Sequence, residues 1–162
     1  MVRIFERPQD LMGCEGETLG PTDWMAIDQA RIDGFADSTD DHQWIHVDPE
    51  RAARGPFGTT IAHGFLTLAL VNKFLPDLLE VRGFTHAVNI GCDGVRFLNV
   101  VPCGARIRGT GEITQVEEKK GAIQSRVKVT VEIDGQERPA CIVETISRYF
   151  PEPDQQKDGP DA

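Results

Sequence analysis

The densest group of polar side chains lies between residues 40 and 48. It holds three carboxylates, two imidazoles and an amide, namely Asp40, Asp41, His42, Gln43, His46 and Asp48. An Asp and a His a few residues apart in a loop can converge on one water molecule, take a proton from it and return one to a substrate. The same residues also suit a solvated loop with its helix caps, and spacing alone favours that plainer interpretation.

A metal site is the second alternative for this segment. His42 and His46 are four residues apart, the spacing of two ligands on one helix face. The pair lacks the Glu of the His-Glu-x-x-His zinc motif, and the Asp48-Pro49 step predicts a loop rather than the helix that this motif needs. Asp41 and Asp48 could add ligands, but we expect no metal here.

A glycine stands at the start of the most apolar segment, in Ile61-Ala62-His63-Gly64-Phe65. Gly costs a helix about 1 kcal/mol relative to Ala, so its place in a first turn needs a reason. First-turn N–H groups have no partner within the helix, and a Gly lets a ligand oxygen approach them, so Gly64 could stabilise negative charge on a carbonyl oxygen. Close packing of the helix on a sheet explains the glycine equally well. We expect His63 to be a structural hydrogen-bonding residue.

Three helical segments are predicted around these residues. The first covers residues 27–39 with Asp28 as its N-cap, and a helical turn begins at Pro49 after the loop of residues 40–48. Residues 61–81 are apolar almost all round, which predicts a buried helix that Thr59 or Thr60 caps and Pro76 kinks or ends.

The rest of the chain reads as strands, at residues 84–101, 104–118, 121–134 and 137–150. Lys119-Lys120-Gly121 and Asp134-Gly135 are the turn candidates between them. One buried helix followed by four strands predicts an α+β fold, an antiparallel sheet wrapped around the helix in a single domain of residues 1–150. Such a sheet leaves an edge to protect, so we expect a dimer. We expect residues 1–25 to be irregular and the polar, proline-rich tail of residues 151–162 to be disordered.

Composition excludes several classes of protein. The chain has 162 residues and a net charge of −9, which argues against nucleic acid as a partner because phosphate binding needs clustered cations. No run approaches the roughly 18 apolar residues of a membrane span, and the first residues do not look like a secretory signal, so we expect a cytoplasmic protein without a membrane partner. The four cysteines form no Cys-x-x-Cys pair and are expected to be free structural thiols, Cys14, Cys92, Cys103 and Cys141.

Two ordered blocks carry a family resemblance. The first runs from Phe35 through Asp41, His46 and Asp48-Pro49 to Ala52, and the second is Gly55-Pro-Phe-Gly-Thr-Thr-Ile-Ala-His-Gly-Phe65. Together they resemble the MaoC-like dehydratase family, which includes the (R)-specific enoyl-CoA hydratases, and within it the NodN-like branch. The later strands look similar too, so the resemblance covers roughly residues 20–150.

The resemblance implies a hotdog fold, a long central helix wrapped by an antiparallel sheet, that usually works as a homodimer. The family's catalytic Asp falls on Asp41, its catalytic His on His46, and the glycine whose amide binds the thioester oxygen on Gly64. The five-residue spacing decides for Asp41 over Asp40. Many relatives have Asn-Pro where this chain has Gln43-Trp44, a departure typical of the NodN-like branch, and we expect the Gln43 side-chain amide to hold the loop instead.

We therefore expect reversible syn addition of water to a trans-2-enoyl thioester, giving the (R)-3-hydroxyacyl thioester, with Asp41 and His46 as the acid–base pair and no cofactor. A hotdog thioesterase and a non-catalytic acyl-thioester-binding subunit are the alternatives. The presence of both Asp41 and His46 counts against the second alternative.

The expected substrate carrier is CoA, with an acyl-carrier protein as the alternative, although two acidic proteins repel each other. The candidate residues to bind CoA phosphates are Arg51, Arg54, Lys73, Arg82, Arg96, Arg106 and Arg108.

Overall fold

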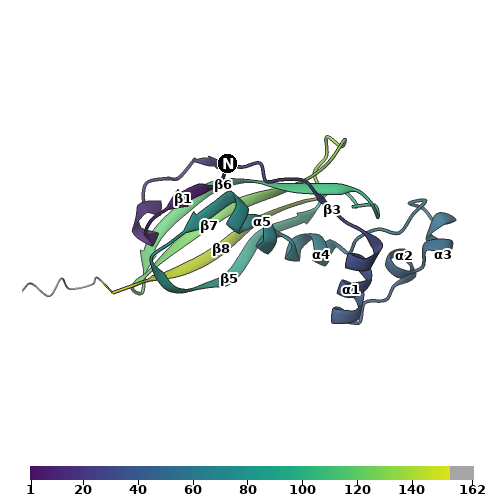
Figure 1. The fold of residues 1–162 in the computed structure, drawn as a ribbon, viewed down its shortest axis with the longest axis horizontal. Coiled ribbons are helices and arrows are strands. Elements are labelled where there is room, and N and C mark those ends of the chain that lie inside the picture. Colours follow the sequence, from purple (N-terminus) through teal and green to yellow (C-terminus); the bar gives the residue numbers. More distant parts are fainter. Residues whose placement is uncertain (154–162) are drawn as a thin grey trace, which may run out of the picture.

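A curved antiparallel sheet with helices on its concave side forms the body of the molecule (Figure 1), in a computed structural model that describes residues 1–153. The long strands are β5 (Phe84–Phe97), β6 (Arg106–Lys119), β7 (Ala122–Ile133) and β8 (Cys141–Pro151). The short strands are β1 (Arg3–Phe5), β2 (Thr18–Leu19), β3 (Met25–Ala26) and β4 (Leu79–Val81). The helices are a 3-10 turn (Pro8–Leu11), α1 (Gln29–Thr39), α2 (Trp44–Val47), α3 (Pro49–Ala53), α4 (Gly64–Ala69) and α5 (Val71–Leu78).

The four predicted strands are confirmed, and so is the α+β class. The sheet has the order β2-β6-β7-β8-β5, with β3 also paired to β6, and all of these pairings are antiparallel. The β6–β7 turn is where it was expected: Lys120 and Gly121 have φ values of 54° and 75°, the left-handed conformation that a tight hairpin requires.

The central helix differs from its prediction in length and continuity. Instead of one helix over residues 61–81 there are two segments, α4 and α5, which meet at Leu70. Ile61 and Ala62 are extended, because Ile61 bridges to Pro102 and the Ala62 N–H bonds to the Val101 carbonyl. Pro76 lies inside α5, which ends only at Leu78, where the chain enters β4. Neither threonine acts as a cap, since α4 has His63 as its N-cap and no side-chain cap hydrogen bond.

Two segments expected to be irregular carry regular structure. Residues 1–25 contain β1, which pairs in parallel with β4, and β2, which pairs with β6. The loop of residues 40–48 contains the single turn α2, with Asp48 N–H bonded to the Trp44 carbonyl.

Pro151 belongs to β8, and the Glu152 N–H bonds to the Gly83 carbonyl, so the predicted tail begins later than expected. Residues 154–162 of that tail lie outside the described residues.

The hydrophobic core lies between the sheet and α5. Val71, Phe74 and Leu78 of α5 are buried against inward-facing strand residues such as Ile107 and Val129. The helix lies close to the sheet at Gly109 of β6, where an added Cβ would lie 2.8 Å from the Cβ of Phe74. The space under Phe74 therefore admits only glycine without a shift of the helix or the strand.

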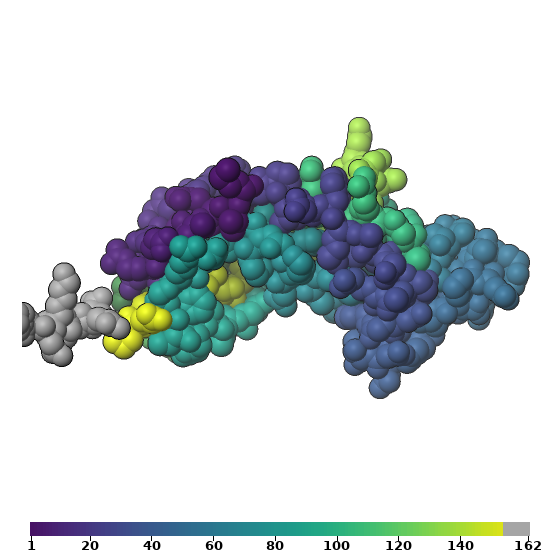
Figure 2. Space-filling model, in the orientation of Figure 1, coloured from purple at the N-terminus to yellow at the C-terminus, as the bar shows by residue number. Residues whose placement is uncertain are grey.

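Helices α1, α2 and α3 form a lobe that stands out from one end of the sheet (Figures 1 and 2). Asp28 caps α1, as predicted, by accepting a hydrogen bond from the Arg31 N–H at 2.9 Å. Asp48 caps α3 in the same way, at 3.0 Å from the Arg51 N–H. No helix among residues 1–153 is long and apolar enough to cross a membrane.

Gly109→Ala tests the close approach of α5 to the sheet. We expect it to destabilise the protein by about 1–3 kcal/mol, because the new methyl group overpacks the core. Gly34→Ala in α1 is the matched control: nothing lies within 4 Å of its added Cβ, so the same change should stabilise the helix by about 0.5–1 kcal/mol. Denaturant unfolding of both variants measures the two changes in unfolding free energy. Equal changes in the two variants would contradict the proposed packing.

Candidate active site

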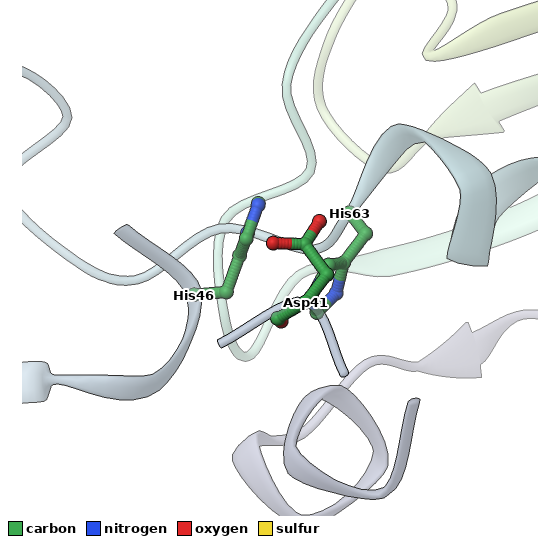
Figure 3. Close-up of side chains that lie close together, drawn as sticks. All are labelled: Asp41, His46 and His63. Carbon is green, nitrogen blue, oxygen red and sulfur yellow. The ribbon is translucent and has the colours of Figure 1, made fainter. Parts of the chain in front are cut away.

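Asp41 and His46 come together at the junction between the helical lobe and α4. Their ligand atoms, with one from His63, all lie within 4.8 Å of one another. Figure 3 shows a ring nitrogen of His46 directed toward the carboxylate of Asp41, with His63 beside them. The structure thus brings together three of the predicted site residues.

The end of α1 places Asp41. Asp40 ends the helix in a left-handed conformation (φ 58°, ψ 18°), which turns the chain so that the next residue faces the junction. The backbone carbonyl of Asp41 accepts a hydrogen bond from His63 Nε2 at 3.0 Å, and its Oδ1 accepts one from the Gln43 N–H at 3.4 Å. Asp40 itself serves as the helix terminus and is absent from the three-residue cluster.

His46 lies in α2 with only 7% of its surface exposed. Its Nδ1 lies 2.7 Å from the carbonyl oxygen of Ile61, which can only accept a hydrogen bond, so Nδ1 carries the proton. In the neutral ring, Nε2 is therefore left with a lone pair. This nitrogen can accept a proton or a hydrogen bond beside the Asp41 carboxylate.

Gln29 is a supporting residue that the sequence did not reveal. Its side-chain amide donates to the backbone carbonyl of His46 at 2.7 Å, and its Oε1 accepts a hydrogen bond from the Thr60 hydroxyl. The side chain thus joins the start of α1, α2 and the segment before α4. A glutamine in a first helical turn has no sequence pattern that predicts such a role.

Gly64 is the first residue of α4 and borders a cavity of about 360 Å³. Among residues 1–153, its N–H has no backbone acceptor, as expected for a first helical turn. An added Cβ would lie 3.2 Å from the ring of Phe97, so close packing, the other explanation for this glycine, also applies. His46, Thr67 and Phe97 line the same cavity, and most of its other lining residues are apolar.

One predicted supporting role differs from the structure. The Gln43 side chain makes no hydrogen bond within the described part of the chain, and only its backbone contacts Asp41. His42 is exposed and pairs with Asp37 at 2.9 Å rather than joining His46, so the alternative of a His42–His46 metal pair, which was not expected, does not form. His63 does form the expected structural hydrogen bond.

Asp41, His46 and His63 have the residue types of a metal site but an unfavourable geometry for one. The two imidazole rings are stacked, with centroids 3.8 Å apart and planes 24° apart. A metal ion binds imidazole nitrogen in the plane of the ring, and two stacked rings have lone pairs that run side by side rather than converge. The arrangement suits a proton-transfer site better than a metal centre.

The pKa of His46 lies below its ordinary value of 6.5. Burial is the main cause, because it disfavours the charged ring; the hydrogen bond to Ile61 raises the pKa, the charge of His63 lowers it, and Asp41 raises it. At neutral pH, His46 is therefore neutral and its Nε2 lone pair is free.

The chain matches known proteins along most of its length. The family model described as MaoC like domain matches residues 12–135. The chain is 50% identical to 3-hydroxyacyl-thioester dehydratase Z of Mycobacterium tuberculosis over 91% of this chain and 99% of that protein. It is 43% identical to nodulation protein N of Rhizobium leguminosarum bv. viciae, over 82% of this chain and 84% of the other.

A solved structure shares the fold. The (R)-hydratase from A. caviae involved in PHA biosynthesis has a TM-score of 0.68 and 22% identity, over 86% of this chain and 96% of that one. The expected hotdog fold and the expected class of enzyme, a hydro-lyase, are confirmed by these matches. With half of its residues identical to a curated dehydratase over nearly the full length of both, and a family model matched across most of the chain, this protein belongs to the MaoC-like dehydratase family.

Proposed function

We propose that this protein catalyses the reversible syn addition of water to a trans-2-enoyl thioester, giving the (R)-3-hydroxyacyl thioester. One observation carries the proposal: a carboxylate oxygen of Asp41 and a ring nitrogen of His46 lie within 4.8 Å of each other, and His46 lines the cavity beside Gly64. The name of the Mycobacterium tuberculosis relative, a 3-hydroxyacyl-thioester dehydratase, supports the same chemistry.

The catalytic water would lie between two acceptors. An ionised Asp41 and a neutral His46 each accept one O–H of the water, which leaves an oxygen lone pair for the β-carbon of the enoyl group. As the C–O bond forms, one of the pair takes the water proton, and a proton returns from the pair to the α-carbon on the same face. The product gains the elements of one water, and the pair ends in its starting state.

The thioester oxygen would accept the Gly64 N–H. Negative charge grows on this oxygen while the β-carbon is attacked, so a fixed amide donor stabilises the transition state more than the substrate. The apolar residues of the cavity would surround the acyl chain, and Phe97, which lies over Gly64, would form the wall nearest the reacting carbons.

The candidate cations for CoA phosphates differ in whether they already pair with a carboxylate of this chain. Lys73, Arg82, Arg106 and Arg108 each pair with a carboxylate of this chain. Arg51, Arg54 and Arg96 have no such partner among the described residues, so we propose that CoA phosphates meet this second set. Arg51 also lies over the ring of Trp44, 4.3 Å from its centroid, which holds its guanidinium near α2 and the candidate site.

We further propose that the working form is a homodimer joined through β5. Strand β5 is the edge strand of the sheet, and its outer edge pairs with no other strand among residues 1–153. Large apolar side chains are exposed on it and beside it: Val88 and Ile90 at 42%, Phe97 at 46% and Phe65 at 69%. A second copy of the strand would cover these side chains and satisfy the edge.

Turnover of crotonyl-CoA tests the reaction directly, by loss of the conjugated thioester absorbance. We expect Asp41→Asn and His46→Ala each to lower kcat by about 10²–10⁴-fold. The double variant should lose little more than either single variant, because the two groups act as a unit.

Asp40→Asn and His42→Ala are the matched controls for these variants, because both residues lie beside the pair without joining it. We expect both variants to hydrate crotonyl-CoA as fast as the unmodified protein. Absence of turnover with enoyl thioesters of every chain length would refute the proposal, and release of free thiol without hydration would indicate a thioesterase.

The low pKa of His46 predicts the acid limit of hydration. As the pH falls through this pKa, Nε2 gains a proton and can no longer accept one from water, so kcat/KM should fall. Because the folded-state pKa is lowered, we expect the midpoint of this fall below 6.5. A profile of kcat/KM against pH, with NMR titration of the His46 ring, measures this midpoint. A midpoint above 6.5 would contradict the prediction.

Ile90→Lys tests the β5 interface. We expect it to shift the protein toward the monomer, because a charge would be buried against the partner strand. Ile4→Lys is the control, since Ile4 is similarly exposed, at 38%, but lies on β1. Sedimentation equilibrium of both variants and of the unmodified protein measures the masses, and a monomeric unmodified protein would refute the interface.

A further inference from the structure

His63 is the most deeply buried ionisable side chain of the candidate site, with 2% of its surface exposed. We propose that His63 is a positioning residue that holds Asp41, His46 and the Gly64 amide in one fixed geometry. The inference rests on the proposed function, since it assigns the residue that aligns the acid–base pair with the carbonyl-binding group. His63 itself is given no proton transfer.

The contact with Asp41 fixes the backbone of the carboxylate-bearing residue. His63 Nε2 donates to the Asp41 carbonyl at 3.0 Å, while the other hydrogen bond to this residue, from the Gln43 N–H, is longer at 3.4 Å. The Asp41 side chain is exposed in the single chain. Without the His63 bond, little within the described residues would hold this turn against the site.

The contact with His46 fixes the plane of the ring. The ring centroids of the two imidazoles are 3.8 Å apart. His63 also packs against Phe35 of α1, with ring centroids 5.0 Å apart. His46 is held at one edge by the Ile61 carbonyl and at one face by His63. A ring held at edge and face keeps one orientation, and Figure 3 shows it beside the carboxylate of Asp41.

The position of His63 in the chain extends this alignment to Gly64. His63 is the N-cap of α4, so its side chain contacts the acid–base pair while its backbone leads directly into the Gly64 amide. His63 thus links the acid–base pair to the proposed carbonyl-binding amide within one residue. Such rigidity matters because a misplacement of about 1 Å can cost about 10²-fold in rate.

The two ring nitrogens of His63 have different surroundings. Nε2 carries a proton, because the carbonyl oxygen of Asp41 can only accept a hydrogen bond. Nδ1 is buried and has no hydrogen-bond partner among the described residues. The polar and titratable groups packed against this ring are His46 and Asp41, and Phe35 adds an apolar face.

Two variants separate the two contacts. His63→Phe keeps an aromatic ring against His46 but loses the N–H donor, and His63→Gln keeps an N–H donor but loses the ring. We expect each to lower kcat for crotonyl-CoA hydration by about 10–10²-fold while KM changes only a few-fold. Both should also raise the His46 titration midpoint seen by NMR, and the acid limit of kcat/KM with it, because the lowering contribution of His63 is gone.

Gly109→Ala is the control for lost stability. It should lower the unfolding free energy without moving the His46 titration, because it lies under Phe74 and not at the site. If either His63 variant keeps both the wild-type kcat and the wild-type His46 titration, the two-contact role is overturned. If the unmodified enzyme hydrates no enoyl thioester, the proposed function fails, while the NMR titration of the variants still tests the alignment of His46 by itself.

Discussion

The extended backbone of residues 60–62 is the point where the helical lobe, the central helix and the sheet are joined. Thr60 accepts the Cys103 N–H, Ile61 donates to the Ile45 carbonyl, and Ala62 donates to the Val101 carbonyl. The Ile61 carbonyl then accepts His46 Nδ1. A buried backbone group left without a partner costs about 1–3 kcal/mol, so these bonds stabilise one arrangement of the three parts. The positions of His46 and Gly64 both depend on it.

The extended conformation of residues 61 and 62 could not be predicted from the sequence. Apolar side chains at 61 and 62 continue the pattern of the helix that follows, and nothing in the residue types separates a buried strand from the first turn of a buried helix. Their backbone partners, at 101–103, lie some forty residues away along the chain. The predicted helix also ran too far at its C-terminal end, because residues 79–81 pair with β1, which lies in the segment that was expected to be irregular.

Features that depend on a few neighbouring residues were predicted correctly. Period-two alternation and turn residues predicted all four long strands, since both signals are contained within a few residues. The neighbourhood of Asp41 and His46 was also predictable, because a turn and a short helix separate them and a chain that short keeps them near each other. Gln29 and the stacking of His63 on His46 were not, because each depends on how α1 and α4 are placed around α2.

The pairing of the strands has a consequence for the order in which the chain can assemble. Strand β5 is made before β8, its partner in the sheet, and β1 is made long before β4. Pairings so distant along the chain form slowly, because the loop between them must close first. While the ribosome is still adding β6 and β7, β5 has neither its sheet neighbour nor a second copy, and its exposed valine and isoleucine side chains are open to other chains. Because these side chains stay exposed after β8 has paired with β5, completing the last strand covers only one edge of β5, and the proposed dimer would cover the rest.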